Sequence, residues 1–203
     1  MLNVVKEPCT MLICGRTNCG KTKFILDLLE HEYKHHFEKI FIICSTIRVN
    51  KTYRERSWIK TDHHIFCIEP QDKLFHWITF LSHCYTEVES LFIIDDIIAD
   101  KSLDKKRQSL IDLAISGRHR KHSLWLLTQS YTAIPKNLRR QKKMLIFWYP
   151  NEKSDLKIMD EETNVIDDLE QIKHKLRQSK YSCLFVRLEY PYEYCVLKNE
   201  SLQ

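Results

Sequence analysis

Glycine is scarce in this chain: 3 of its 203 residues are glycine, where an average protein of this length holds about 14. Two of the three, Gly15 and Gly20, lie in one short segment, and the third is Gly117. A chain so poor in glycine is expected to keep it where the backbone needs a tight turn or a close approach. The segment around Gly15 and Gly20 is therefore the first candidate for a functional loop.

Long hydrophobic runs are lacking as well. No apolar stretch approaches the roughly 20 residues that a helix needs to span a bilayer. The first residues, MLNVVKEPC, have neither the basic region nor the apolar stretch of a secretion signal. The sequence therefore argues against a membrane span and predicts a soluble, intracellular protein.

Paired metal-binding patterns are also missing, although the chain contains eight cysteines and ten histidines. No C-x-x-C pair occurs, and no histidine group has the spacing of a zinc site. Cys14, Cys44, Cys67 and Cys183 lie inside apolar runs. We therefore expect reduced, mostly buried thiols rather than disulfides or a structural metal.

The length and the 43% hydrophobic content suit one α/β domain over residues 1–203, with a motif core at about 10–150 and a helix-plus-hairpin extension at about 151–203. Apolar runs predict strands, and helical spacing predicts helices between them. The predicted strands are 11–14, 39–45, 64–70, 91–96, 123–130 and 144–149, and the predicted helices are those after residue 20, at 74–85, about 103–116 and 165–176. This alternation predicts a mainly parallel sheet flanked by helices. Residues 46–62 are expected to be an irregular, basic insertion, and the two strands around 189–192 are expected to pair as a C-terminal β-hairpin.

The segment GRTNCGKT, residues 15–22, matches the pattern G-x-x-x-x-G-K-[ST] between a predicted strand and a predicted helix. Such a loop binds phosphate because successive backbone N–H groups and the helix N-terminus point at the anion. In this pattern Lys21 reaches the β- and γ-phosphates and Thr22 holds Mg²⁺. The predicted nucleotide-binding residues are Gly15, Arg16, Thr17, Asn18, Cys19, Gly20, Lys21, Thr22 and Lys23.

Two aspartates end the hydrophobic strand LFIIDD at residues 91–96. Asp95 can bind Mg²⁺ at the sheet edge where the nucleotide crevice of an α/β sheet lies. Asp96 is placed to orient and polarise an attacking water. A helix cap or turn is the alternative interpretation of the pair, and the complete phosphate loop upstream favours the catalytic one.

Gln129 and Arg118 are two further catalytic candidates. Gln129 ends a strand expected beside the two motif strands, where it could sense the γ-phosphate or hold water; the alternative is an ordinary polar strand end. Gly117 is expected to end the preceding helix. Arg118 directly after it could stabilise transition-state charge in a neighbouring subunit, or simply interact with the helix dipole.

Basic residues are concentrated at 118–122 and 136–143, although the formal net charge is only +5. Clustered cations are what binding to a phosphate backbone requires, and a solvated surface that binds nothing is the alternative. The DNA-contact candidates are Arg120, Lys121, Arg139, Arg140, Lys142 and Lys143.

The segments GRTNCGKT, LFIIDD and SGRHRKHSLWLLTQSYTAIPKNLRR resemble the genome-packaging ATPases of large DNA viruses, virophages and Polinton-type elements, the poxvirus-like branch of the FtsK/HerA superfamily. This resemblance covers about residues 10–150. It implies a RecA-like ASCE P-loop NTPase fold, ATP and Mg²⁺ as cofactors, and a homo-oligomeric ring that pumps double-stranded DNA, without reading its sequence, into a capsid through a capsid or portal vertex protein. It also implies Asp95 and Asp96 as the Walker-B pair, Gln129 as the polar sensor and Arg118 as the trans finger. For a viral source, the expected locations are the host nucleus, a cytoplasmic virus factory and the virion.

Two other functions remain open at this point. A nucleotide or nucleoside kinase also has a phosphate loop and often an Arg-rich lid, but no motif for a phosphate acceptor is evident. A non-hydrolysing ATP-binding assembly protein is the second alternative. The intact set of Lys21, Thr22, Asp95 and Asp96 argues against it, because a site that no longer hydrolyses usually loses one of these groups.

Overall fold

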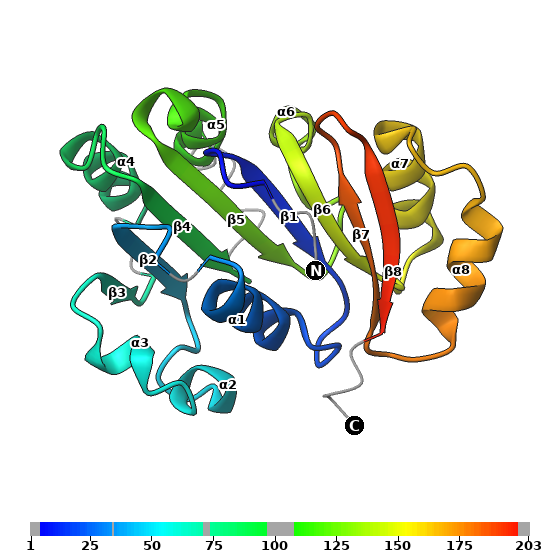
Figure 1. The fold of residues 1–203 in the computed structure, drawn as a ribbon, viewed down its shortest axis with the longest axis horizontal. Helices are drawn as coiled ribbons and strands as arrows, with labels where there is room; N and C mark the ends of the chain where they lie inside the picture. The colour runs from blue at the N-terminus through cyan, green and yellow to red at the C-terminus, as the bar shows by residue number, and fades with distance from the viewer. Residues whose placement is uncertain (1–4, 34, 71–73, 97–107, 199–203) are drawn as a thin grey trace.

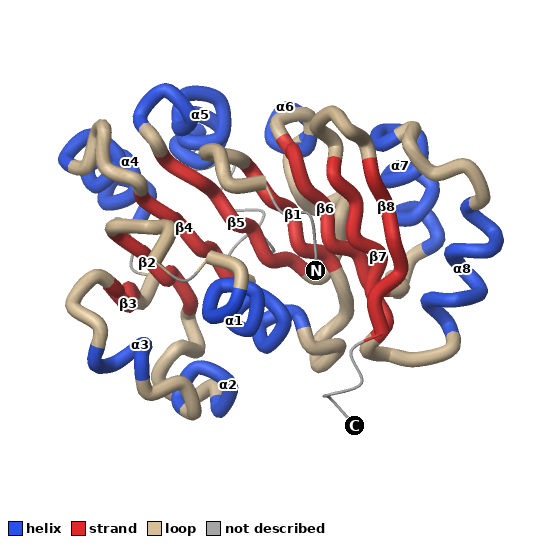
Figure 2. The backbone as a smooth tube through the Cα atoms, in the orientation of Figure 1, coloured by secondary structure: helices blue, strands red, loops and turns tan. Residues whose placement is uncertain are grey.

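The computed structural model describes residues 5–33, 35–70, 74–96 and 108–198. These residues form a sheet covered by helices on both faces (Figure 1, Figure 2). The strands are β1 Thr10–Cys14, β2 Lys39–Cys44, β3 Ile65–Ile68, β4 Ser90–Asp95, β5 His122–Thr128, β6 Lys142–Trp148, β7 Ser182–Arg187 and β8 Glu193–Lys198. The helices are α1 Lys21–His31, α2 Lys51–Arg54, α3 Trp58–Thr61, α4 Leu74–Cys84, α5 Gln108–Ser116, the 3-10 helix η2 Gly117–Arg120, α6 Lys136–Arg139, α7 Lys153–Thr163 and α8 Leu169–Arg177.

The strand order is β3-β2-β4-β5-β1-β6-β7-β8. The pairs from β3 to β6 are parallel, and β7 and β8 add an antiparallel hairpin. Strand β3 lies at the edge of the sheet, so it does not separate the two motif strands. β5 lies between β1 and β4, and the carboxyl ends of these three strands point the same way in Figure 1. The predicted α/β fold, with a mainly parallel sheet and a C-terminal hairpin, is confirmed.

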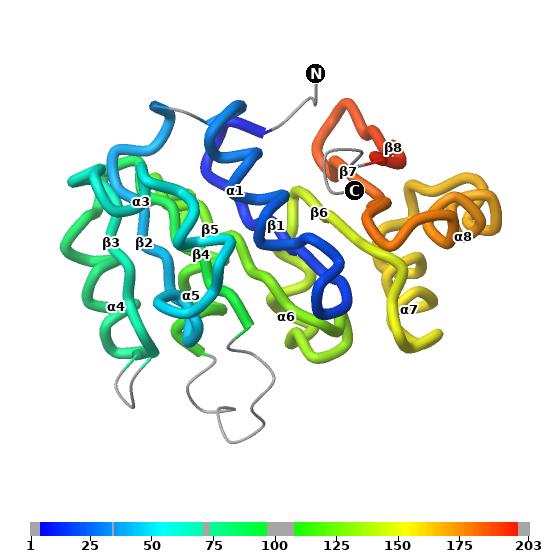
Figure 3. Tube along the Cα trace, turned by 90° about the horizontal axis from the view of Figure 1, so that it is seen from below, coloured from blue at the N-terminus to red at the C-terminus, as the bar shows by residue number. Residues whose placement is uncertain are grey.

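Alternating side chains of the strands pack against two separate helical layers, and Figure 3 shows helices on the two sides of the sheet. In β1, Met11 and Ile13 face α1, α2 and α3, whereas Leu12 faces the layer of α4 to α8. The central strands read as continuous apolar runs because both of their faces are buried. None of the helices that the structure describes has the length and apolarity needed to cross a lipid bilayer.

The segment 46–62 is more regular than the sequence predicted. It contains the short helices α2 and α3, whose buried residues Tyr53 and Ile59 attach the segment to the layer of α1. Four-residue helices are too short to show a 3.6-residue apolar period, so the pattern gave no helical signal.

Helix α7 was not predicted, because residues 151–170 show mainly an excess of acidic residues. Leu156 and Met159 are nevertheless buried against the sheet. The helix predicted at 165–176 begins later, at Leu169, since the Asp168 side chain accepts a hydrogen bond from the Gln171 N–H and caps it.

One smaller expectation also needs correction. Cys67 is exposed rather than buried, because β3 is an edge strand whose faces are only partly covered. Helix α5 ends at Ser116, directly before Gly117, as expected, and the chain continues as the 3-10 helix η2 from Gly117. A Cβ at Gly117 would lie 3.2 Å from the His122 carbonyl oxygen, so close packing accounts for this glycine. The predicted start of that helix, 103–107, lies outside the described residues.

Candidate active site

The phosphate-binding pattern lies in the loop between β1 and α1. Its two glycines are required for different structural reasons. A Cβ at Gly15 would lie 2.8 Å from both the Cys19 Sγ and the Trp148 Cβ, so no side chain fits there. Gly20, just before α1, has a φ of 99° in the left-handed region, which glycine adopts without strain. The Gly15 N–H donates to the Thr128 carbonyl oxygen at 3.1 Å, which joins the loop to the end of β5.

Lys21 is 8% exposed and turns back over the loop. Its Nζ donates hydrogen bonds to the carbonyl oxygens of Gly15 at 2.7 Å and Arg16 at 2.9 Å. The ammonium group therefore lies inside the ring of the loop, beside the N-terminus of α1. This placement puts a positive charge beside the N–H groups at the start of α1, which suits a phosphate anion.

Asp95 and Thr22 meet at the end of β4. The Thr22 hydroxyl donates to the Asp95 Oδ2 at 3.1 Å, and Asp95 is 5% exposed. Burial raises the pKa of Asp95, and hydrogen bonds from Tyr53 and Thr22 oppose that rise. A hydroxyl and a carboxylate in contact beside a phosphate loop are oxygen ligands of the kind Mg²⁺ prefers, so these residues fit the ion that the pattern implies.

Gln129 joins the phosphate loop to the second aspartate. Its Oε1 accepts a hydrogen bond from the Thr17 hydroxyl at 3.0 Å, and its Nε2 donates to the Asp96 Oδ2 at 2.9 Å. Thr17, Asp96 and Gln129 are all exposed. Asp96 has a φ of 63°, a left-handed conformation that is uncommon outside glycine and is enriched at functional sites. The structure thus brings together groups that the sequence assigned to three separate motifs.

Asp155 of α7 supports the Gln129 loop, and the sequence did not predict it. Asp155 is 1% exposed, and its Oδ1 accepts hydrogen bonds from the Ser130 hydroxyl at 3.0 Å and the Thr132 N–H at 2.9 Å. The turn after β5 is therefore held in place by a carboxylate from α7, a helix later in the chain. An aspartate inside an acid-rich segment carries no sequence signal that separates it from its exposed neighbours.

The Arg16 side chain contacts the chain that follows β6. Its Nε donates to the Tyr149 carbonyl oxygen at 3.1 Å and its Nη2 to the Pro150 carbonyl oxygen at 3.2 Å. Its guanidinium carbon lies 5.5 Å from the centre of the Tyr149 ring, and that of Arg177 lies 4.9 Å from the same centre. In this conformation Arg16 fastens the loop to the chain after β6, and its predicted contact with nucleotide stays a prediction.

The basic candidates gather at the edge where the strands begin, opposite the phosphate loop. Residues 118–121 directly precede β5 and residues 136–141 precede β6, and both strands are parallel to β1. Because β5 spans roughly 20 Å at the usual rise per residue, Arg118 is far from the phosphate loop of its own chain. Arg118 is exposed, so it is available to a neighbouring molecule.

The six DNA-contact candidates differ in exposure. Lys121 and Arg140 are exposed, whereas Arg120 and Lys143 are half-buried. Arg139 and Lys142 are buried. The Arg139 guanidinium is held by Glu162, with Nη2 to Oε1 at 2.8 Å. Two members of the basic run therefore stabilise the fold, and only the other four remain in the proposal below.

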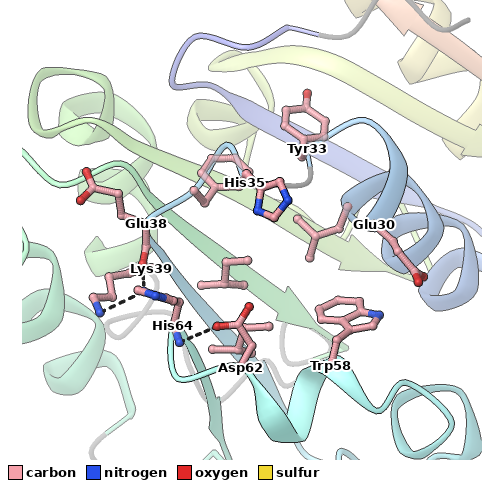
Figure 4. Close-up of a pocket in the computed structure, with 12 residues that line it drawn as sticks. Glu30, Tyr33, His35, Glu38, Lys39, Trp58, Asp62 and His64 are labelled. Atoms are coloured by element: carbon pink, nitrogen blue, oxygen red, sulfur yellow. Dashed lines mark hydrogen bonds between the residues drawn. The ribbon is translucent and has the colours of Figure 1, made fainter.

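A pocket of about 530 Å³ lies between the end of α1, α3 and the first residues of β2 and β3 (Figure 4). Its labelled side chains include Tyr33, Trp58, Asp62 and His64. These residues belong to the strand-start edge of the sheet, and none of its lining residues belongs to the phosphate loop. The pocket is therefore separate from the candidate active site.

Comparison with solved structures shows the same fold. The genome packaging NTPase B204 from Sulfolobus turreted icosahedral virus 2, in complex with AMP, has a TM-score of 0.66 and 16% identity, covering 96% of this chain and 98% of that one. B204 was also solved with AMPPCP and with ATP-gammaS. The pCW3 conjugation coupling protein TcpA, with ATPgS, has a TM-score of 0.61 and 13% identity, covering 93% of this chain and 60% of that one.

Comparison of sequences identifies the family. The DNA packaging protein OPG160 of variola virus is 29% identical over 147 residues, which cover 66% of this chain and 50% of the relative. The chain thus spans about half the length of the curated relatives it matches. A family model described as poxvirus A32 protein matches residues 2–182. The resemblance drawn from the motifs is confirmed, and the chain belongs to the poxvirus A32 protein family.

Proposed function

We propose that this chain is a Mg²⁺-dependent ATPase that moves double-stranded DNA and packages a viral genome into a capsid. The observation that carries the proposal is the bridge made by Gln129, which contacts both Thr17 of the phosphate loop and Asp96. A phosphate donor bound at the loop would lie beside the two groups best suited to orient water. A kinase instead needs a second pocket there for its acceptor.

The chain's own residues divide the work of hydrolysis. Lys21 and the loop N–H groups bind and orient the phosphates. Thr22 and Asp95 would hold Mg²⁺, which neutralises charge on the phosphates when it is bound. Asp96 accepts a proton from the attacking water while Gln129 fixes the position of that water.

Arg118 completes the site from a neighbouring chain in this proposal. Its place at the strand-start edge prevents it from reaching the phosphate loop of its own chain, and its exposure leaves the guanidinium available. An arginine supplied in trans stabilises the charge that develops during phosphoryl transfer. A homo-oligomeric ring is the assembly that supplies one such arginine to every site.

DNA is proposed to contact the same strand-start edge through Arg120, Lys121, Arg140 and Lys143. Such contacts with phosphates carry no sequence preference. A capsid or portal vertex protein is the proposed partner at the virion. The variola virus relative is described as a DNA packaging protein. This description supports the proposed DNA packaging role of the chain, with the host cell and the virion as the places where it acts.

The test is steady-state ATP hydrolysis with Mg²⁺, with and without long double-stranded DNA, over a range of salt concentrations. We expect DNA to stimulate hydrolysis and the stimulation to fade as salt rises. Lys21→Ala should abolish turnover, and Lys157→Ala, which removes an exposed lysine of α7, should not. Full activity in Lys21→Ala would contradict the proposal. Turnover that ignores DNA but rises with a nucleoside acceptor would indicate a kinase.

A further inference from the structure

Tyr53, from the segment between β2 and β3, reaches the metal-binding carboxylate. It belongs to α2 and is 2% exposed. Its hydroxyl donates a hydrogen bond to the Asp95 Oδ2 at 2.8 Å. Residues 42 positions apart in the sequence thus meet in the interior, next to the hydroxyl of Thr22, which donates to the same oxygen at 3.1 Å.

The same segment is also tied to the helix that follows the phosphate loop. Arg56, two residues after the end of α2, forms ion pairs with Asp27 and Glu30 of α1. At the start of α2, the Asn50 side chain accepts a hydrogen bond from the Thr52 N–H and caps the helix. Residues 50–56 therefore form a brace that contacts both α1 and the end of β4, and we call this segment the α2 brace.

The hydrogen bond from Tyr53 limits how the Asp95 carboxylate can turn. A buried phenol needs an acceptor, and here the acceptor is the carboxylate itself. With Oδ2 held by two hydroxyls from different elements, rotation of Asp95 would break both contacts. Partners that hydrogen-bond to a ligand carboxylate fix its orientation, and their loss typically lowers metal affinity or activity 10- to 100-fold.

We propose that Tyr53 is a positioning residue for Mg²⁺–nucleotide binding, and that the α2 brace sets the orientation of Asp95 through it. This inference rests on the proposed ATPase function. Tyr53 touches neither nucleotide nor water in this role. It acts through Asp95, so its removal should change the Mg²⁺ requirement and leave binding of the nucleotide to the loop intact.

The test compares Tyr53→Phe with Tyr33→Phe. Tyr33 is also 2% exposed, and its hydroxyl donates to the Val5 carbonyl oxygen at 2.6 Å, away from the site. Each variant loses one buried hydroxyl, so the pair controls for stability. Binding of a fluorescent ATP analogue is measured first in EDTA and then against rising Mg²⁺, beside a thermal unfolding curve.

We expect Tyr53→Phe to bind the analogue like wild type in EDTA and to need about 10-fold more Mg²⁺ for the half-maximal effect. Tyr33→Phe should match wild type in both measurements. An unchanged or lowered Mg²⁺ midpoint in Tyr53→Phe, or an equal shift in Tyr33→Phe, would overturn the inference. If Tyr53→Phe does not fold, Tyr53→Met, which fills the same space with a flexible side chain, takes its place with the same criteria. If Mg²⁺ leaves wild-type binding unchanged, the proposed function itself fails.

Discussion

The contact of Asp155 with the Gln129 loop gives a prediction whose size can be worked out from the structure. Asp155→Ala removes the acceptor of both the Ser130 hydroxyl and the Thr132 N–H. The Thr132 N–H is left without this partner, and an unsatisfied group of this kind costs about 1–3 kcal/mol. The Ser130 hydroxyl keeps its contact with the Thr132 Oγ1 at 2.9 Å, so the variant should lose roughly 1–3 kcal/mol of unfolding free energy. The measurement is denaturant unfolding followed by tryptophan fluorescence.

Asp155→Asn is the matched control, because both hydrogen bonds fall on the single oxygen Oδ1. An amide keeps one oxygen that can accept from both donors, so this variant should lose no more than about 1.5 kcal/mol, the part due to charge. The turnover number should also fall more in Asp155→Ala than in Asp155→Asn, because the loop that Asp155 holds carries Gln129. Equal stability loss in the Ala and Asn variants would refute the reasoning, and so would wild-type stability in Asp155→Ala.

Three further predictions concern the ion pair on α7, the water-positioning amide and the trans arginine. Glu162→Ala should cost about 3–5 kcal/mol, because it leaves the buried guanidinium of Arg139 without its partner; chemical unfolding measures this. Burial alone would raise the pKa of Glu162, but hydrogen bonds from Arg139 and a neighbouring tyrosine, with the Arg139 charge, lower it overall. The Glu162 carboxylate therefore contributes its full stabilisation above its ordinary pKa of 4.5, and this stabilisation is lost as the pH falls through the lowered pKa. Between neutral pH and that lowered pKa, the wild-type protein should lose more unfolding free energy than Glu162→Gln. Gln129→Ala removes the donor to Asp96 and should lower turnover about 100-fold, by analogy with loss of one transition-state hydrogen bond, at unchanged nucleotide affinity. Weaker binding at normal turnover would argue against the water-positioning role. Arg118→Ala should retain nucleotide binding by the isolated chain and lose DNA-stimulated hydrolysis in the assembled ring, and full ring activity would exclude Arg118 as the trans finger.

The sequence predicted the fold and the motif residues because their signals are local. The phosphate loop is a run of eight residues between a strand and a helix, and Asp95 ends an apolar strand. Since parallel strands end at one edge, the sequence could also predict that Gln129 would lie near the loop. It could not give the bridge from Thr17 to Asp96, which depends on the order of strands and on side-chain orientation.

The residues that sequence analysis did not identify contact residues that are far away in the sequence. Tyr53 reaches Asp95 across 42 positions, and Asp155 reaches Ser130 across 25. Neither lies in a periodic pattern: Tyr53 occurs in a polar stretch and Asp155 in an acid-rich one. For Arg139 the sequence predicted too much exposure rather than too little contact. A basic run favours a charged surface, but Arg139 is buried and paired with Glu162.

These contacts separate the chemistry of the site from its geometry. In the proposed function, Lys21, Asp95 and Gln129 supply the groups that bind and react. The orientation of Asp95 then depends on the α2 brace, and the turn after Gln129 depends on α7. Both supporting segments lie outside the motifs. A change in either can alter the distance between water, carboxylate and phosphate by a fraction of an ångström, and rates are sensitive to displacements of that size. Relatives with identical motifs can therefore differ in turnover, and the places to look for the cause are residues 50–56 and 153–163.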